Sequence, residues 1–170
     1  MSGKLIMREE GNNLVMEWIF DAPREEVFKA FSDSKLLESW WGPEGWETKN
    51  KKFEFEPGGI WHYGMTCKDK SQGEFYGMES WGLAVYKEIS APEKIVHTDA
   101  FSDEEGNINE SLPKTLITST FSEEGGKTRY VSVTKFPSSG AIRQIIDMGA
   151  AEGFSSQLKK LDALLSGNKV

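Results

Sequence analysis

The strongest constraint on the fold is a change in the spacing of apolar residues along the chain. Between residues 46 and 137 apolar and polar residues alternate, whereas beyond residue 137 apolar residues recur at helical spacing. Alternation is typical of strands with one buried face, and helical spacing is typical of an amphipathic helix. Turn residues divide the alternating region at Pro57-Gly58-Gly59, Asp69–Gly73, Ala91-Pro92 and Glu123-Glu124-Gly125-Gly126. We therefore predict six antiparallel strands followed by one long helix.

The N-terminal part adds a hairpin and two short helices. Leu14 to Phe20 is rich in strand-forming residues, and the turn before it is expected to pair it with Lys4–Arg8. Pro23 with the acids after it favours a helix start, and Asp33 is expected to cap a second helix over Ser34–Trp41. The pattern predicts an α+β fold, a curved antiparallel sheet of about six to seven strands around a long C-terminal helix. We expect one domain over residues 1–170.

The C-terminal helix carries two apolar faces that do not coincide. Ile142, Ile145 and Ile146 mark one face, and the apolar residues from Phe154 onward mark a face rotated by roughly 100°. Gly149 and Gly153 lie where the faces disagree. We expect a bend there, a change of partner surface, or a helix that begins only near Met148. The acidic, aperiodic segment Ser102–Ser111 is expected to be an exposed loop.

Composition and charge exclude several classes of protein. Of 170 residues, 38% are hydrophobic and 12% aromatic, which is too apolar for a disordered chain and too interrupted for a membrane span. The net charge of −7 repels phosphate, so nucleic acid is not an expected partner. Cys67 is the only cysteine, which excludes an internal disulfide, and the N-terminus lacks the apolar stretch of an export signal. We expect a soluble, cytoplasmic protein.

An internal cavity is the expected binding site. In the segment Ile60–Cys67, alternation turns Trp61, Tyr63 and Met65 toward the helix, and small residues interrupt the helix opposite them. These residues either form plain core or leave a space lined by aromatic rings, which suits an apolar ligand. The predicted lining comprises Trp40, Trp41, Trp61, Tyr63, Met65, Trp81, Met148, Gly149, Gly153 and Phe154.

Residues suited to catalysis or metal binding are few. The histidines His62 and His97 fall on different strands, with Cys67 and Asp99 as potential neighbours. Alternation places His62 on the face opposite the aromatic side chains, hence outward. A metal site needs three or four ligands at workable spacing, and none is seen, so no metal, cofactor or catalytic residue is predicted. Glu88 is the remaining candidate acid or base, beside the simpler interpretation of an exposed or paired strand carboxylate.

Several short motifs, in order, resemble those of a known family. The motifs are Phe20-Asp21-Ala22-Pro23, Val27-Phe28-Lys29-Ala30-Phe31, Trp40-Trp41-Gly42-Pro43, Pro57-Gly58-Gly59, Glu88-Ile89, Pro92-Glu93-Lys94-Ile95 and Glu152-Gly153-Phe154 with Leu158 and Leu161. Over about residues 14–165 the chain resembles the START-like (SRPBCC) superfamily. Within it, the resemblance is to the branch named after the C-terminal domain of the activator of the heat-shock protein 90 ATPase.

The resemblance implies a helix-grip fold with a hydrophobic cavity, and it leaves the activity open, since the superfamily includes carriers, cyclases and co-chaperones. We expect a START-like protein that binds a small hydrophobic or amphipathic ligand without chemistry. One alternative is a cyclase- or dehydratase-like enzyme that uses a buried carboxylate or Tyr63 as its acid. Another is an interaction module for a chaperone, which the absence of the activator's N-terminal domain disfavours. Homodimerisation stays open.

Overall fold

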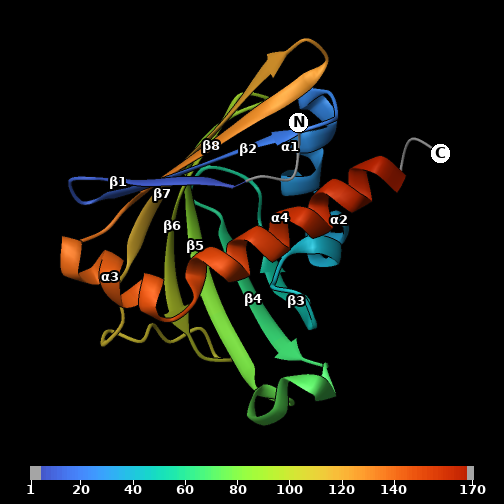
Figure 1. Cartoon of the computed structure of the whole chain (residues 1–170). Helices are drawn as coiled ribbons and strands as arrows, with labels where there is room; N and C mark the ends of the chain where they lie inside the picture. Colours follow the sequence, from blue (N-terminus) through green and yellow to red (C-terminus); the bar gives the residue numbers. More distant parts are fainter. Residues whose placement is uncertain (1–4, 168–170) are drawn as a thin grey trace.

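Eight strands form one antiparallel sheet in the computed structural model, which describes residues 5–167 (Figure 1). The strands are β1 (Ile6–Glu10), β2 (Asn13–Phe20), β3 (Trp46–Phe53), β4 (Ile60–Cys67), β5 (Glu79–Ser90), β6 (Lys94–Ser102), β7 (Thr115–Glu124) and β8 (Lys127–Lys135). Their spatial order is β1-β2-β8-β7-β6-β5-β4-β3. The six strands predicted from the alternation are all present. The total exceeds the predicted six to seven because the hairpin partner β1 also joins the sheet.

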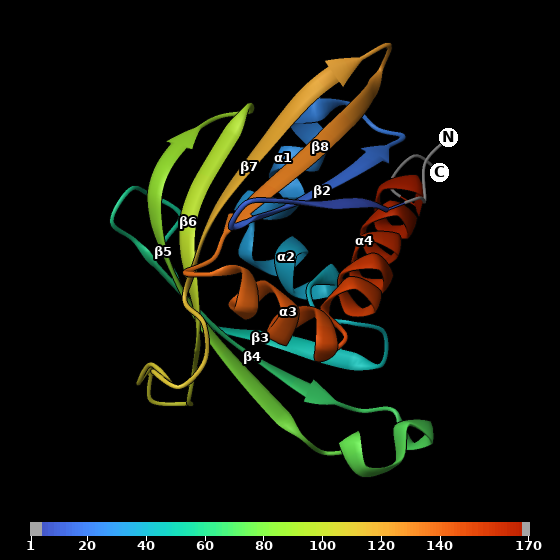
Figure 2. The same ribbon diagram turned by 60° about the vertical axis from the view of Figure 1, so that its left-hand side comes forward.

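In the described part of the chain, four α-helices lie on the concave side of this sheet, which curls around them (Figure 2). They are α1 (Arg24–Ser32), α2 (Ser34–Trp40), α3 (Ser139–Asp147) and α4 (Ala150–Gly167), and a short 3₁₀ segment, η1 (Lys70–Phe75), joins β4 to β5. The predicted α+β architecture with two short helices after a strand is therefore confirmed. None of the helices within residues 5–167 combines the length and apolarity needed to cross a bilayer.

The C-terminal helix is broken at the point where its apolar faces disagree. α3 ends at Asp147, and Gly149 adopts a positive φ of 88° before α4 begins. A left-handed residue at this position ends a helix, and glycine takes that conformation without steric cost. The long C-terminal helix is α4, which begins just after Met148 as one of the expected alternatives, and the residues before it form the separate helix α3. Each of them keeps its own buried face.

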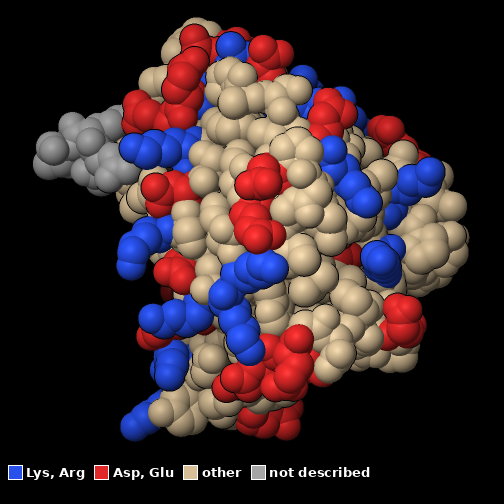
Figure 3. All heavy atoms as spheres, turned by 180° about the vertical axis from the view of Figure 1, so that it is seen from behind, with Lys and Arg blue, Asp and Glu red and all other residues tan. Residues whose placement is uncertain are grey.

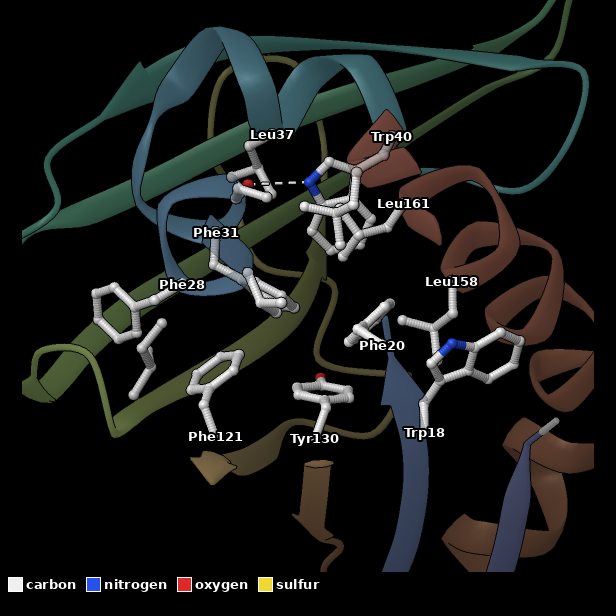
Figure 4. Packing of buried hydrophobic residues seen from close by; sticks show 14 of the residues in the cluster. Trp18, Phe20, Phe28, Phe31, Leu37, Trp40, Phe121, Tyr130, Leu158 and Leu161 are labelled. Atoms are coloured by element: carbon white, nitrogen blue, oxygen red, sulfur yellow. Dashed lines mark hydrogen bonds between the residues drawn. The ribbon is translucent and has the colours of Figure 1, made fainter. Parts of the chain in front are cut away.

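The core fills the space between the sheet and α1, α2 and α4. Phe31 of α1 lies at its centre, with ring centroids 4.8 Å from Trp40, 5.1 Å from Phe121 and 5.4 Å from Tyr130 (Figure 4). Trp40 is fully buried, and its indole Nε1 donates a 2.9 Å hydrogen bond to the carbonyl oxygen of Ala30. Aromatic rings that meet edge to face bury large areas and hold one another's orientation. The core therefore fixes α1 and α2 against the sheet.

The opposite, convex face of the sheet carries Lys and Arg interspersed with Asp and Glu (Figure 3). The predicted loop after Ser102 is present, and it folds back far enough for Ser102 to form a bridge with Ile108. His62 lies on this convex face, as alternation predicted, but only 6% of it is exposed. Its Nε2 lies 2.9 Å from the carbonyl oxygen of Asp103 in the loop. His62 therefore points outward as expected, and the loop covers it.

Candidate functional site

A cavity of about 270 Å³ separates the inner face of the sheet from the helices. Residues of every strand except β3 line one side of the cavity, and residues of α1 to α4 line the other. The lining is mostly apolar. This volume lies just below the range of about 300–1,000 Å³ that is typical of sites for small molecules.

Five of the ten residues predicted for this lining have their side chains on the concave side where the cavity lies. They are Trp41, Trp61, Tyr63, Met65 and Phe154. Three of the rings form a cluster, in which the Trp61 centroid lies 4.5 Å from that of Tyr63 and 4.8 Å from that of Trp41. They come from β4 and from the residue that follows α2, so the cluster joins two parts of the chain that only the fold brings together.

Four predicted residues lie away from the cavity lining. Trp40 belongs to the core beside Phe31. Met148 is 57% exposed in the break between α3 and α4, and Gly149 forms the turn itself. The missing side chain of Gly153 would point toward Pro43. Because α4 begins anew after the break, a different set of residues faces the cavity: Ala150, Ala151, Phe154 and Gln157.

Trp81 contributes to the cavity wall through its strand, while its indole lies on the convex face. Trp81 is paired with Gly64, whose neighbours Tyr63 and Met65 face the cavity. A Cβ atom at Gly64 would lie 2.6 Å from the Trp81 ring, and the ring centroid lies 5.2 Å from that of His62. Side chains of directly paired residues share one face of a sheet. The Trp81 side chain therefore belongs to the outer surface.

A polar group interrupts the apolar lining on β6. The hydroxyl of Tyr63 donates to the carboxylate of Asp99, with oxygen–oxygen distances of 3.2 and 3.3 Å. Burial raises the pKa of Asp99 to about 7, although the hydrogen bonds from Tyr63 and from the Ala100 backbone act in the opposite direction. Burial and the nearby Asp99 raise the pKa of Tyr63 well above its ordinary value. The carboxyl group of Asp99 therefore titrates near neutral pH, and Tyr63 keeps its proton there.

Glycine at position 82 allows this contact across a strand. Tyr63 is on β4 and Asp99 is on β6, with β5 between them. A Cβ atom at Gly82 of β5 would lie 2.4 Å from the Tyr63 hydroxyl oxygen, closer than real Cβ atoms approach. Only glycine leaves room for the tyrosine side chain to lie over the middle strand.

We predict that Gly82→Ala displaces Tyr63 and raises the pKa of Asp99 above that of the wild type, because the hydrogen bond that favours the charged carboxylate is lost. Overpacking should also destabilise the protein by about 1–3 kcal/mol. Carbon-13 NMR titration of the Asp99 carboxyl measures the first effect. Gly64→Ala is the matched control, since its methyl meets Trp81 on the convex face. An Asp99 titration shifted equally by both variants would contradict the assignment.

His97 is the second polar side chain on this wall. It is 8% exposed, and its Nδ1 has no hydrogen-bond partner among the described residues. Burial lowers its pKa to about 4, so the ring is neutral at pH 7. His97 and Asp99 are two residues apart on β6 and both line the cavity. The cavity thus holds a neutral imidazole beside a carboxyl group that titrates near neutrality.

Gln157 presents a third polar group from the helix side. Its Oε1 accepts a 2.8 Å hydrogen bond from the backbone N–H of Gly42, which fixes the orientation of the amide. The buried Nε2 on the other side has no partner among the described residues. Buried donors are nearly always hydrogen-bonded, so this N–H is available to a water molecule or a ligand that enters the cavity.

Sequence reasoning assigned no role in the cavity to Asp99, His97 or Gln157. Alternation along β6 could have placed His97 and Asp99 on the same face, but the face that turns inward depends on how β6 pairs with its neighbours. The other candidate, Glu88, is an exposed carboxylate that pairs with Lys94 at 3.3 Å, in agreement with the simpler interpretation. Within residues 5–167 no group of three or more Asp, Glu, His or Cys side chains is arranged to hold a metal ion.

Comparison with known proteins identifies relatives along nearly the whole chain. The structure resembles the crystal structure of protein Ms6760 from Mycobacterium smegmatis, with a TM-score of 0.85 and 30% identity over 95% of this chain and 97% of that one. A solution structure from Staphylococcus epidermidis has a TM-score of 0.81 and 30% identity, and covers 95% of this chain and 94% of that one. A solution structure from Arthrobacter aurescens has a TM-score of 0.85 and 27% identity, with coverage of 95% and 91%.

The more distant crystal structure of CalU16 from Micromonospora echinospora, with 18% identity, a TM-score of 0.59 and coverage of 98% of this chain and 86% of that one, shares the fold alone. No curated protein matches the sequence. Residues 21–166 match the family described as activator of Hsp90 ATPase homolog 1-like protein. This match spans most of the chain and agrees with the resemblance read from the motifs. The chain belongs to this family of activator of Hsp90 ATPase homolog 1-like proteins, a START-like branch.

Proposed function

We propose that the protein binds a small, mostly apolar molecule in the cavity between the sheet and α3 and α4, without changing it chemically. The observation that carries this proposal is the cavity itself, which is about 270 Å³ in volume and is lined by aromatic and aliphatic side chains. Transfer of an apolar molecule from water into a cavity of this kind is favourable, because apolar surface is removed from water. Its few polar groups would then fix the orientation of the ligand.

Two further features indicate that the cavity is a ligand-binding site and not a packing defect. The ring of Trp41 meets those of Trp61 and Tyr63 edge to face, and the rings of Trp61 and Tyr63 lie tilted against each other, so the wall is formed before a ligand arrives. In addition, two buried polar atoms on opposite walls, His97 Nδ1 and Gln157 Nε2, lack partners among the described residues. A ligand with hydrogen-bonding groups would satisfy both.

The proposal predicts that small neutral compounds raise the melting temperature of the protein. A panel of naphthalene derivatives, medium-chain alcohols and aromatic polyketides is suitable for differential scanning fluorimetry. A ligand present at a hundredfold excess over its dissociation constant should stabilise the protein by about 2.7 kcal/mol. Ala150→Trp, which places an indole in the cavity, should abolish the shift.

Ala163→Trp is the matched control for this experiment, because Ala163 lies on the exposed side of the same helix. It should preserve the ligand-induced shift. The proposal fails if no compound in the panel stabilises the wild type, or if Ala150→Trp responds to ligands as strongly as the control does.

The carboxyl group of Asp99 favours proton transfer as a second candidate function. A carboxylate with a pKa of about 7 that faces an apolar cavity is suited to act as a general base. Asp99 would remove a proton from a carbon beside a carbonyl group and then return it to another carbon of the same molecule, so no co-reactant is needed. Incorporation of deuterium into a bound ligand in D₂O by the wild type, and its absence with Asp99→Asn, would favour this function over binding alone.

A further inference from the structure

We propose that Asp99 and His97 form a subsite for the amino group of a cationic, otherwise apolar amine, whose body occupies the rest of the cavity. This inference rests on the proposed binding function and specifies the chemical class of the ligand. It is carried by the geometry of the two side chains and by the charges that line the cavity.

The two side chains supply acceptors on one face of one strand. Residues two apart on a strand are separated by about 6.6 Å and point the same way, which leaves room for one ammonium group between Asp99 and His97. Tyr63 donates to the Asp99 carboxylate and holds it in place. The Nδ1 atom of the neutral His97 ring, which has no partner among the described residues, can accept a second hydrogen bond from the same ammonium group. An ammonium group, which has three donors and no acceptor, matches this pair.

The charges of the cavity favour a cation and oppose an anion. Among the described residues that line it, Asp99 is the only carboxylate, and there is no Lys or Arg. The aromatic rings add to the same effect, because the face of an aromatic ring attracts a cation. A ligand that ends in a carboxylate would meet a like charge and no cationic partner. Ligands with an acidic head, such as fatty acids, are therefore expected to bind poorly.

Protonation of Asp99 should make binding of the amine depend on pH. The titratable side chains that face Asp99 are Tyr63 from β4, Tyr86 from β5 and His97 from β6, and the helices add no titratable group to the described lining. The pKa of Asp99 is about 7, whereas His97 titrates near 4 and both tyrosines are raised above their ordinary values. Above neutrality Asp99 is charged and pairs with an ammonium ion. Affinity for an amine should therefore rise as pH increases through about 7.

Three probes that share one apolar body test the inference by isothermal titration calorimetry. They are naphthylmethylamine, naphthylmethanol and naphthoic acid, which carry a cation, a neutral hydroxyl and an anion. For the wild type at pH 8 we expect the amine to bind at least about tenfold more tightly than the alcohol, and the acid to bind most weakly. In Asp99→Asn the amine should lose this advantage while the alcohol still binds, which shows that the cavity is intact.

Glu88→Gln is the control for the loss of one negative charge, because Glu88 lies at the exposed end of β5 and pairs with Lys94. It should leave the order of the three affinities unchanged. The inference is overturned if the alcohol binds the wild type as tightly as the amine, or if Asp99→Asn keeps the preference for the amine. If Asp99→Asn does not fold, the pH dependence in the wild type decides, and an amine affinity that does not rise between pH 6 and pH 8 overturns it.

Failure of the inference differs from failure of the proposed function. If the alcohol binds but the amine has no advantage, the cavity remains a binding site and only the ligand class is wrong. If none of the three probes binds and no compound in the neutral panel stabilises the protein, the binding function is wrong and the amine subsite falls with it.

Discussion

The free energy of unfolding of the Asp99→Asn variant is expected to increase by about 3 kcal/mol as pH rises from about 4 to 7. That of the wild type should change little over the same interval. The reason is that two buried groups have opposite effects. The pKa of His97 is lowered to about 4 in the folded protein, so raising pH removes a proton that the unfolded chain binds more strongly and stability increases. Asp99, with its pKa raised to about 7, binds its proton more strongly when folded, and its contribution is lost as pH rises.

The measurement is the free energy of urea unfolding at several pH values for the wild type and two single variants. Removing the carboxyl leaves the His97 contribution alone, so the stability of Asp99→Asn should rise with pH. Removing the imidazole in His97→Phe leaves Asp99 alone, and stability should fall by about 3 kcal/mol over the same interval. Parallel curves for all three proteins would show that neither side chain titrates inside the cavity.

Trp40→Ala is expected to lower the free energy of unfolding by about 3–5 kcal/mol, the usual cost of truncating a buried aromatic side chain. Trp40 is fully buried against Phe31 and hydrogen-bonded to the backbone of α1, so its loss leaves a cavity and an unpaired carbonyl group. Chemical denaturation monitored by circular dichroism, which does not depend on tryptophan number, measures the change.

Trp41→Ala is the natural comparison, because its ring is partly exposed and faces the cavity. It should cost much less stability than Trp40→Ala and should weaken binding of the neutral panel, since it removes one of the three rings that form the wall. Equal destabilisation by the two variants would contradict the assignment of Trp40 to the core and Trp41 to the cavity.

The sequence was sufficient to predict the type and order of the elements. Alternation located strands β3 to β8, and the inward face of β4 followed from the aromatic residues at every second position. Gly149, together with the rotation of the apolar stripe, pointed to the break between α3 and α4. These features depend on local backbone preferences and on periodicity, which a single sequence carries directly.

The sequence was not sufficient where the outcome depended on pairing between strands. The sequence prediction placed the Trp81 side chain in the cavity. The pairing of Trp81 with Gly64, which turns its side chain to the convex face, depends on the register between β4 and β5. The meeting of Tyr63 with Asp99 depends on two strand pairings and on a glycine in the strand between them. Pairing register is a tertiary property, and a shift of one residue would exchange the two faces. The polar part of the site therefore emerged only from the structure.

The sheet does not close on itself, so β1 and β3 are left as edge strands. An open edge offers unpaired backbone groups to any neighbouring strand and is a common route to aggregation. Here β1 carries Arg8, Glu9 and Glu10, and β3 carries several lysines along a largely exposed strand. Another chain that paired with either edge would have to bring these charges together or strip them of water. Side chains at the two margins of the sheet thus help to keep separate molecules from adding strands to one another.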